Sequence, residues 1–464
     1  MASYEKSIVR PAMVQGKLAL PSLDLSRSGK SLIRHPSNPK VGSPFRHLAW
    51  PLIAFMVLLL MPPETSLAIG SLRLSPYRML LIVGSLMALT RLLSGRCGRV
   101  ILTDWFIAGH VFWVLLSLFQ YGGIGTGFES GGVYGLEAAG SYLLARAYIR
   151  NSSDYRAMLK LHLMLVAVLA VCVIPESLTG IHFVRDVARS VLGGVGPHYM
   201  DPRLGLERAF GPFEHPILLG VFASSVLTGA VLVLGMGQAS VGNIKRIALV
   251  GITTLMSLSG GPIVAFALQA VLIGWERVSR LLRGRWYVAL SGLGFLYIAI
   301  DLISTRTPVL VFIQYLTFSR ESAYNRVHIW NYGTEEILRY PMFGIGLGDW
   351  ERASWMSSSM DNFWLLTAMR YGLPALLFLL AAIVALLFAL IRKHNVDPIL
   401  RQSRLAWGIT MISLAVVGLT VHFWNNIFCL FFFLIGSGAW MATMPNQRIQ
   451  ALRNNPRQME VADD

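Results

Sequence analysis

The chain has 464 residues, of which 54% are hydrophobic and 14% are charged. Soluble proteins contain about 25% charged residues, so this chain has too few charges to cover a globular surface in water. Its formal net charge of +16 would indicate a nucleic-acid partner in a soluble protein. In a membrane protein, an excess of Lys and Arg instead marks the cytoplasmic side. The composition therefore excludes an ordinary soluble domain and favours an integral membrane protein.

Residues 1–46 are polar, basic and rich in Pro and Ser, and the first apolar run begins only after them. A secretory signal peptide has its apolar region within roughly the first 30 residues, with a small-residue cleavage site after it. Neither feature is present, and the composition is typical of a segment that forms no apolar core. We therefore expect a disordered, basic cytoplasmic tail.

Apolar runs recur along the rest of the chain. A membrane-spanning helix needs about 20 mostly apolar residues, and we expect about 12 transmembrane helices in an all-α polytopic domain over residues 47–442. Residues 443–464 should form a second cytoplasmic tail. The seventh and eighth spans, like the last two, are separated by so few residues that we predict tight hairpins. The candidate spans lie near residues 47–62, 76–92, 101–119, 131–148, 158–178, 213–236, 246–260, 262–278, 286–303, 361–391, 405–421 and 423–442.

The distribution of charge supports this order of spans. Because Lys and Arg are enriched in cytoplasmic loops, every second connection should be basic. With both termini in the cytoplasm, the tails and alternate connections carry 28 of the 40 Lys and Arg residues. The net charge thus indicates membrane orientation, and we expect no nucleic-acid partner.

All the Lys residues fall on the predicted cytoplasmic side, and every basic residue elsewhere is an Arg. The sequence leaves two interpretations open. An Arg-rich composition would produce this bias by chance. Alternatively, the outer arginines bind anionic oxygens, because the guanidinium group is planar, always charged and bidentate toward phosphate or carboxylate.

Two predicted periplasmic loops are much longer than the others, at about residues 180–212 and 304–360. Long loops in compact proteins usually carry function or are disordered. The second loop is too aromatic for disorder, and its stretch Glu321–Leu338 has the apolar spacing of an amphipathic helix. Pro341 should end that helix, and the glycines of Gly344–Gly348 should form a bend.

The first long loop ends in charged residues beside the sixth predicted span. Arg203 and Arg208 precede a Gly-Pro turn at Gly211 and a His-Pro step at His215. A cation close to the bilayer costs free energy, although less toward the interface. A cluster of arginines there indicates an anionic partner, and lipid headgroup anchoring is the simpler explanation that stays open.

These residues are part of a set of motifs that resembles the superfamily of O-antigen ligases and O-antigen or exopolysaccharide (Wzy-like) polymerases, which are bacterial membrane glycosyltransferases. The similarity in order and spacing covers about residues 200–390, whereas the earlier spans match only as hydrophobic helices. The motifs are Arg208-Ala-Phe-Gly-Pro-Phe-Glu-His-Pro-Ile-Leu-Leu-Gly220, Arg326-Val-His-Ile-Trp330, Tyr340-Pro-Met-Phe-Gly-Ile-Gly-Leu-Gly348, Asp361-Asn-Phe-Trp-Leu-Leu and Arg370-Tyr-Gly-Leu-Pro374.

The resemblance implies a C-type glycosyltransferase-like bundle with a periplasmic substrate cleft. It also implies glycan transfer from undecaprenyl diphosphate to an acceptor without a metal, and we expect no cofactor. The resemblance assigns Arg208 and Arg326 to diphosphate recognition, and Arg203 joins them only by proximity. Trp330 and Asn362 stand in the same motifs and complete the expected substrate-binding set.

Asp361 stands where ligases of this superfamily usually have a His, which is a candidate base for the acceptor hydroxyl. A carboxylate can also accept this proton, so Asp361 is a candidate catalytic base. Asp is equally favoured as a helix N-cap, and the sequence leaves both roles open. A second departure lies at Ser257–Gly261, where many members place an Arg after the second Ser. Both departures favour a chain polymerase over a ligase.

Other residues are candidates for a supporting role. His215 and His328 lie within the motifs and would orient a carboxylate or the acceptor, so we group them with Asp361 as catalytic candidates. Glu214 and Glu321 are further candidate bases, unless each forms a salt bridge with a nearby Arg. The three cysteines form no CxxC pair, and no metal-binding motif is present, so we expect no metal.

The sequence therefore predicts a polysaccharide polymerase of the bacterial inner membrane, which transfers an undecaprenyl-diphosphate-linked glycan to a lipid-linked acceptor on the periplasmic face. Its expected partners are that lipid-linked oligosaccharide, the bilayer and a chain-length regulator. One alternative is an O-antigen ligase, which would transfer the glycan to lipid A-core or protein. Another is a flippase or transporter, although transporters usually show internal repeats and mid-span charges, and we find no convincing repeat.

Overall fold

The computed structural model describes residues 48–70, 72–193, 200–282, 284–305, 308, 311, 320–393 and 397–444. The predicted N-terminal tail lies outside the described residues, and so does almost all of the predicted C-terminal tail. Both predictions for the tails therefore stay predictions.

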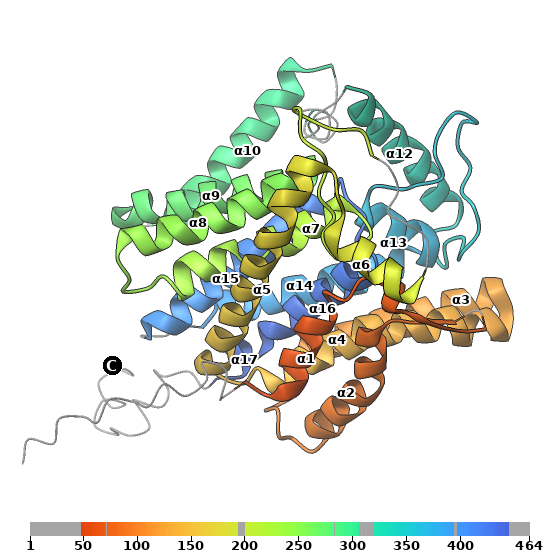
Figure 1. Cartoon of the computed structure of the whole chain (residues 1–464), viewed down its shortest axis with the longest axis horizontal. Coiled ribbons are helices and arrows are strands. Elements are labelled where there is room, and N and C mark those ends of the chain that lie inside the picture. Colours follow the sequence, from red (N-terminus) through yellow and green to blue (C-terminus); the bar gives the residue numbers. More distant parts are fainter. Residues whose placement is uncertain are drawn as a thin grey trace, which may run out of the picture. The chain divides into compact units, whose positions relative to one another are not determined.

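The described chain is mostly helical, as the apolar runs predict (Figure 1). Strands β1 (Leu67–Ile69) and β2 (Leu72–Leu74) form a small antiparallel hairpin. Two 3-10 segments, η1 (Pro63–Thr65) and η4 (Ser279–Leu281), and two π-helical segments, η2 (Leu136–Gly140) and η3 (Gly229–Val233), accompany the α-helices. The α-helices are α1 (Trp50–Leu58), α2 (Pro76–Leu93), α3 (Leu102–Gly135), α4 (Ser141–Tyr148), α5 (Ser152–Thr179), α6 (Phe183–Leu192), α7 (Pro216–Ser224), α8 (Ser240–Met256), α9 (Gly260–Val278), α10 (Arg285–Ile303), α12 (Arg320–Arg339), α13 (Phe363–Tyr371), α14 (Leu373–Ile391), α15 (Pro398–Val417), α16 (Asn425–Ser437) and α17 (Ala439–Thr443).

Eight helices of the described chain are long and apolar enough to cross a membrane. This finding confirms the coarse prediction of an all-α membrane protein. Other predicted spans are shorter as helices, since α1 has 9 residues and α8 has 17. The exact number of crossings therefore stays a prediction.

The third and fourth predicted spans form a helical hairpin. The backbone of Gly123, with φ +68°, reverses the chain within α3. The two arms then pack against each other, and His110 Nε2 lies 2.8 Å from the Tyr134 hydroxyl. Small residues at this spacing are typical of closely packed membrane helices. A Cβ at any of three glycines would contact a side chain of the opposite arm: Gly127, Gly131 and Gly135.

Connections that the charges place on the same side of the membrane contact one another. At one end of the bundle, the Lys393 ammonium donates to the carbonyl of Ala442, which joins two predicted cytoplasmic connections. At the other end, the amide of Phe363 donates to the carbonyl of Gly418 at 2.8 Å, which joins two predicted periplasmic connections. We call these the Lys393 end and the Asp361 end. Both contacts join connections that the charges assign to the same side, as expected for a chain whose connections alternate between the two sides of the membrane.

Two predicted boundaries at the Asp361 end are wrong. The tenth predicted span, residues 361–391, is two helices, because Gly372 with φ +85° separates α13 from α14. A Cβ at Gly372 would lie 1.9 Å from the carbonyl oxygen of Met342, so the chain needs a glycine here. The tight turn predicted between the last two spans is the longer segment 418–424, between α15 and α16.

Both long predicted loops contain a helix. Helix α12 confirms the amphipathic helix that we predicted over residues 321–338, and it ends before Pro341 as expected. Gly344 and Gly346 have φ values of +65° and +62° and form the predicted bend. The first long loop contains α6, which the sequence pattern did not predict. The long loops are thus built elements that place side chains at the Asp361 end.

Candidate functional site

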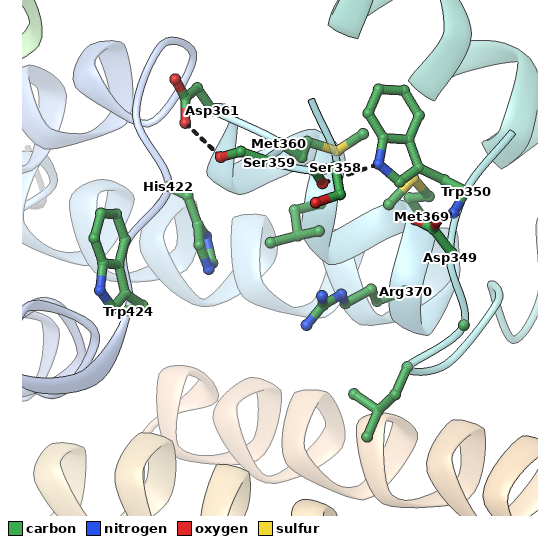
Figure 2. A pocket seen from close by; sticks show the side chains of 13 residues that line it. Asp349, Trp350, Ser358, Ser359, Met360, Asp361, Met369, Arg370, His422 and Trp424 are labelled. Carbon is green, nitrogen blue, oxygen red and sulfur yellow. Dashed lines mark hydrogen bonds between the residues drawn. The ribbon is translucent and has the colours of Figure 1, made fainter. Parts of the chain in front are cut away.

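Three connections meet α13 at the Asp361 end and enclose a cavity of about 380 Å³. They are residues 347–350 after the glycine bend, residues 358–361 before α13, and the segment 418–424 (Figure 2). We call this space the first cavity. Its lining residues are Leu347, Gly348, Asp349, Trp350, Ser358, Ser359, Met360, Asp361, Leu366, Met369, Arg370, His422 and Trp424.

Asp361 lines the first cavity and does not cap the helix that follows it. The N-cap of α13 is Asn362, whose side chain accepts a hydrogen bond of 2.9 Å from the amide of Leu365. Asp361 is half-buried and accepts a hydrogen bond of 3.2 Å from the Ser359 hydroxyl. The capping role considered for Asp361 is therefore wrong. Asn362, predicted to bind substrate, is 2% exposed, has its side-chain oxygen engaged in the cap and is absent from the cavity wall.

Arg208 and Arg203 are held at the turn between α8 and α9. Arg208 donates to the Ser259 hydroxyl at 2.9 Å, and Arg203 donates to the carbonyl of Leu258 at 2.9 Å. Leu258 has φ +44°, the left-handed conformation that this short turn requires. Burial, with a smaller contribution from the Arg203 charge, lowers the pKa of Arg208 to about 10, and the Asp201 carboxylate acts in the opposite direction. The turn thus holds two cations close enough to repel each other.

Arg326 lies on α12 and approaches the same place from a distant part of the sequence. Its side chain is buried, and its Nε has no hydrogen-bond partner among the described residues. Burial lowers its pKa, the Asp361 carboxylate acts in the opposite direction, and the Arg203 charge lowers it further. The charges of Arg326, Asp361 and Arg203 are therefore close enough to interact. No ion pair joins Arg326 to a carboxylate in the described chain.

Arg208 and Arg326 lack the carboxylate partner that the buried Arg146 and Arg185 have among the described residues. A buried charge without a partner is strongly unfavourable, and proteins usually pair it. Arg208 and Arg326 keep guanidinium Nε atoms buried without an acceptor among the described residues. Guanidinium groups in this state have donors available for an anion. The buried and half-buried arginines that pair with a buried carboxylate include, with their nitrogen–oxygen distances, Arg78–Glu137 (2.8 Å), Arg146–Asp104 (3.2 Å), Arg185–Glu64 (2.6 Å) and Arg285–Glu276 (2.7 Å).

Two further polar residues line the cavity and were not among the predicted site residues. Arg370, on α13, has a buried Nε without a partner in the described chain, and His422 has a buried Nδ1 in the same condition. Figure 2 shows both side chains directed into the cavity. Burial, and then the Arg370 charge, lowers the pKa of His422 to about 3, so the ring is neutral at physiological pH. Arg370 lies within a motif quoted above, but His422 stands in no recognised pattern.

His215 lies close to this cluster, at the start of α7. Its Nδ1 accepts a hydrogen bond of 3.1 Å from the amide of Ile217, and so caps that helix. Burial and the charges of Arg208 and Arg203 lower its pKa to about 4. Its ring centroid lies 5.7 Å from that of Trp424, a residue of the cavity wall. His215 is therefore a neutral, anchored ring beside the arginines, and its predicted catalytic role stays a prediction.

The remaining predicted residues are placed differently from what the motifs suggest. Glu214 forms no salt bridge with an Arg in the described chain; it accepts hydrogen bonds from Asn425 at 2.7 Å and Trp424 at 3.2 Å. His328 and the half-buried Trp330 lie on α12, and neither lines the first cavity. The side chain of Glu321 lies outside the described residues.

The chain matches no protein-family model and no curated protein. Among the described residues, no group of three or more His, Cys, Asp or Glu side chains is placed to hold a metal ion. The functional inference therefore depends on the chemistry of the site, which is a carboxylate at the wall of a cavity with unpaired arginines around it.

The buried neutral state of His422 predicts a specific acid sensitivity. An unfolded His takes up a proton below pH 6.5, whereas His422 in the fold does so only near pH 3. Its contribution to stability is complete above pH 6.5 and is lost as the pH falls toward 3. The His422→Gln variant should therefore lose less stability between pH 7 and 4.5, by about 2–3 kcal/mol. Thermal unfolding in lipid nanodiscs at both pH values measures this, and equal losses in both proteins would contradict it.

Proposed function

We propose that this chain is a membrane glycosyltransferase that extends a polysaccharide from an undecaprenyl-diphosphate-linked glycan. The observation that carries the proposal is the burial of Arg208 and Arg326 without a carboxylate salt bridge among the described residues, with Arg326 near Asp361 and Arg203 near both arginines. Unpaired, partly dehydrated guanidinium groups suit a diphosphate, which accepts bidentate hydrogen bonds. A carboxylate beside them supplies the proton acceptor that glycosyl transfer needs.

In the proposed reaction, an acceptor hydroxyl attacks the anomeric carbon of the sugar bound to the diphosphate. The new carbon–oxygen bond forms as the bond from the anomeric carbon to the phosphate oxygen breaks, and the diphosphate leaves with the electron pair. Asp361 accepts the proton of the hydroxyl. Arg208 and Arg326 stabilise the charge that develops on the leaving group, and preorganised cations in a dry site are effective at this. Arg203, near Arg326, and Arg370, in the cavity wall, add positive charge.

The proposal includes a membrane orientation. The Asp361 end would face the periplasm, and the Lys393 end, where most basic connections lie, would face the cytoplasm. Twelve crossings with both termini inside would satisfy this arrangement in a bacterial inner membrane. The C-type glycosyltransferase-like arrangement, the lipid-linked oligosaccharide substrate and a chain-length regulator as partner belong to the same proposal.

Among glycosyltransferases, we propose a polymerase and not a ligase. The site carries Asp361 where ligases usually have a His, and the turn at Ser259 carries no Arg. Arg208 donates to the Ser259 hydroxyl at this turn. The ligase differs only in the acceptor, so the product distinguishes the two.

Deletion of the gene tests this proposal. A polymerase deletion strain should lose long polymer but still make single lipid-linked repeat units, and the wild-type chain should restore the length distribution. Gel electrophoresis of extracted glycans and mass spectrometry of the lipid-linked pool measure both. Accumulation of lipid-linked polymer that is never transferred would assign ligase activity instead. Repeat units trapped on the cytoplasmic face would assign transport.

A further inference from the structure

A second cavity of about 150 Å³ adjoins the first one. Leu366, Arg370, His422 and Trp424 line both cavities, so the two spaces share a common wall. The second cavity lies between α13, the segment 418–424, the start of α16 and the helical hairpin. Its lining residues are Tyr134, Glu137, Phe363, Leu366, Thr367, Arg370, Tyr371, His422, Phe423, Trp424, Asn425 and Phe428.

Half of this wall is aromatic. Tyr134 contacts Tyr371 at a ring-centroid distance of 5.1 Å and Phe428 at 5.0 Å. Phe363 contacts Phe423 at 5.0 Å, and both line the cavity. Aromatic rings that pack on one another in this way are rigid and offer apolar faces at little entropic cost. They suit a ligand that has an apolar face of its own.

The polar part of the wall contains the Glu137 carboxylate, which hydrogen bonds hold in place. Glu137 accepts hydrogen bonds from the Arg78 guanidinium at 2.8 Å and from the Tyr77 hydroxyl at 3.0 Å. Both bonds end on Oε1, and Oε2 is the oxygen that we assign to an occupant of the cavity. Glu137 lies in the π-helical segment η2, and such segments occur frequently at functional sites. An ionisable side chain on a membrane-spanning helix is itself an indication of function.

Asn425 continues this polar network toward the arginines. It has φ +49°, its oxygen lies 3.4 Å from an Arg78 nitrogen, and its amide donates to Glu214 at 2.7 Å. The left-handed backbone of Asn425 therefore accompanies a side chain whose oxygen and amide nitrogen are both hydrogen-bonded. Two donor or acceptor atoms at the wall shared with the first cavity stay free among the described residues, namely Arg370 Nε and His422 Nδ1.

These features together fit one chemical class of ligand. A cavity of roughly 150 Å³ is large enough for a single six-membered ring. The carboxylate disfavours an anion, and Arg370 disfavours a cation, whereas a neutral ring with several hydroxyl groups matches both. The apolar face of a pyranose can rest on the aromatic wall while its hydroxyl groups reach Glu137 and Asn425.

We propose that the second cavity binds one neutral sugar ring of the glycan substrate. Glu137 accepts hydrogen bonds from its hydroxyl groups, and Arg370 and His422 form hydrogen bonds with the ring from the shared wall. This inference rests on the proposed function, which supplies the glycan. Glu137 then determines which sugar is accepted, and the first cavity holds the neighbouring reacting groups.

The test measures sugar binding directly. The full chain is placed in lipid nanodiscs, which avoids detergents with sugar headgroups. Free neutral hexoses, 6-deoxyhexoses and N-acetylhexosamines serve as probes in saturation-transfer NMR. The wild-type chain should bind at least one of these classes. Thr367→Met, which fills the second cavity, and Glu137→Gln should each raise the dissociation constant at least 10-fold.

A control variant separates this effect from misfolding. Glu64→Gln disrupts the buried Glu64–Arg185 pair, which lies outside the cavity wall, and should bind the sugar as the wild type does. Absence of sugar binding in the wild-type chain, or unchanged binding in Thr367→Met, would overturn the inference. Because no donor lipid is used, sugar binding without polymer formation in cells would overturn only the proposed function.

Discussion

Arg208→Ala and Arg326→Ala should each abolish long polymer while the amount of protein in the membrane stays normal. Each guanidinium is buried without a carboxylate partner in the described chain and is proposed to stabilise the departing diphosphate. Loss of one preorganised group of this kind typically reduces turnover by about 10²–10³-fold. Complementation of a deletion strain, with the glycans separated on gels and the protein quantified by immunoblot, measures both effects.

A stability measurement separates a binding role from a structural one. Removal of an unpaired buried charge relieves a desolvation cost, so neither variant should be less stable than the wild type. Arg185→Ala is the matched control, because Arg185 is buried but paired with Glu64 at 2.6 Å. Breaking such a pair costs about 3–5 kcal/mol. We therefore expect a stable, inactive protein in the first case and a destabilised protein in the second.

The lysine variants add a test of geometry. Lys keeps the charge but lacks the planar pair of donors that matches phosphate oxygens. Arg326→Lys should therefore retain only a small part of the activity, although its net charge is unchanged. Wild-type polymer in either alanine variant would remove that residue from the proposed mechanism.

The helical architecture was largely predictable because burial in a membrane leaves a strong local signal. A run of apolar residues of sufficient length indicates a span wherever it occurs, and α5 and α14 follow that rule. The break between α13 and α14 was not predicted, since apolar residues lie on both sides of Arg370-Tyr-Gly-Leu-Pro374 and make a run long enough for one span. The position of this break depends on the carbonyl of Met342, which belongs to another connection and leaves no room for a Cβ at residue 372.

The candidate site was predictable only where a motif carried it. Arg208, Arg326 and Asp361 stand in recognisable motifs. The charges of Arg326 and Asp361 interact, and Arg203 interacts with both Arg326 and Arg208. Glu137 and His422 gave no such signal. Their role depends on partners from other helices, such as the Arg78 guanidinium beside Glu137, and a single sequence does not show which helices will pack together.

Asp361→Asn should eliminate polymer formation without loss of the folded protein. The amide has nearly the same shape as the carboxylate but does not accept the hydroxyl proton. General-base catalysis typically contributes about 10²–10⁴-fold to a rate, so we expect a loss in that range. The cap of α13 belongs to Asn362, and the substitution therefore leaves the helix start intact. In vitro polymerisation with purified lipid-linked repeat units measures the rate.

Binding and turnover should separate in this variant. The Asp361 carboxylate opposes the arrival of an anion beside Arg326, so its neutralisation should leave pyrophosphate affinity unchanged or increase it while turnover falls. Ser359→Ala provides the comparison, because the Ser359 hydroxyl only donates to the Asp361 carboxylate at 3.2 Å. That variant should keep most of its activity. If Asp361→Asn loses pyrophosphate binding and turnover together, Asp361 organises the site and the proton must leave by another route. If turnover is unchanged, Asp361 has no part in the chemistry.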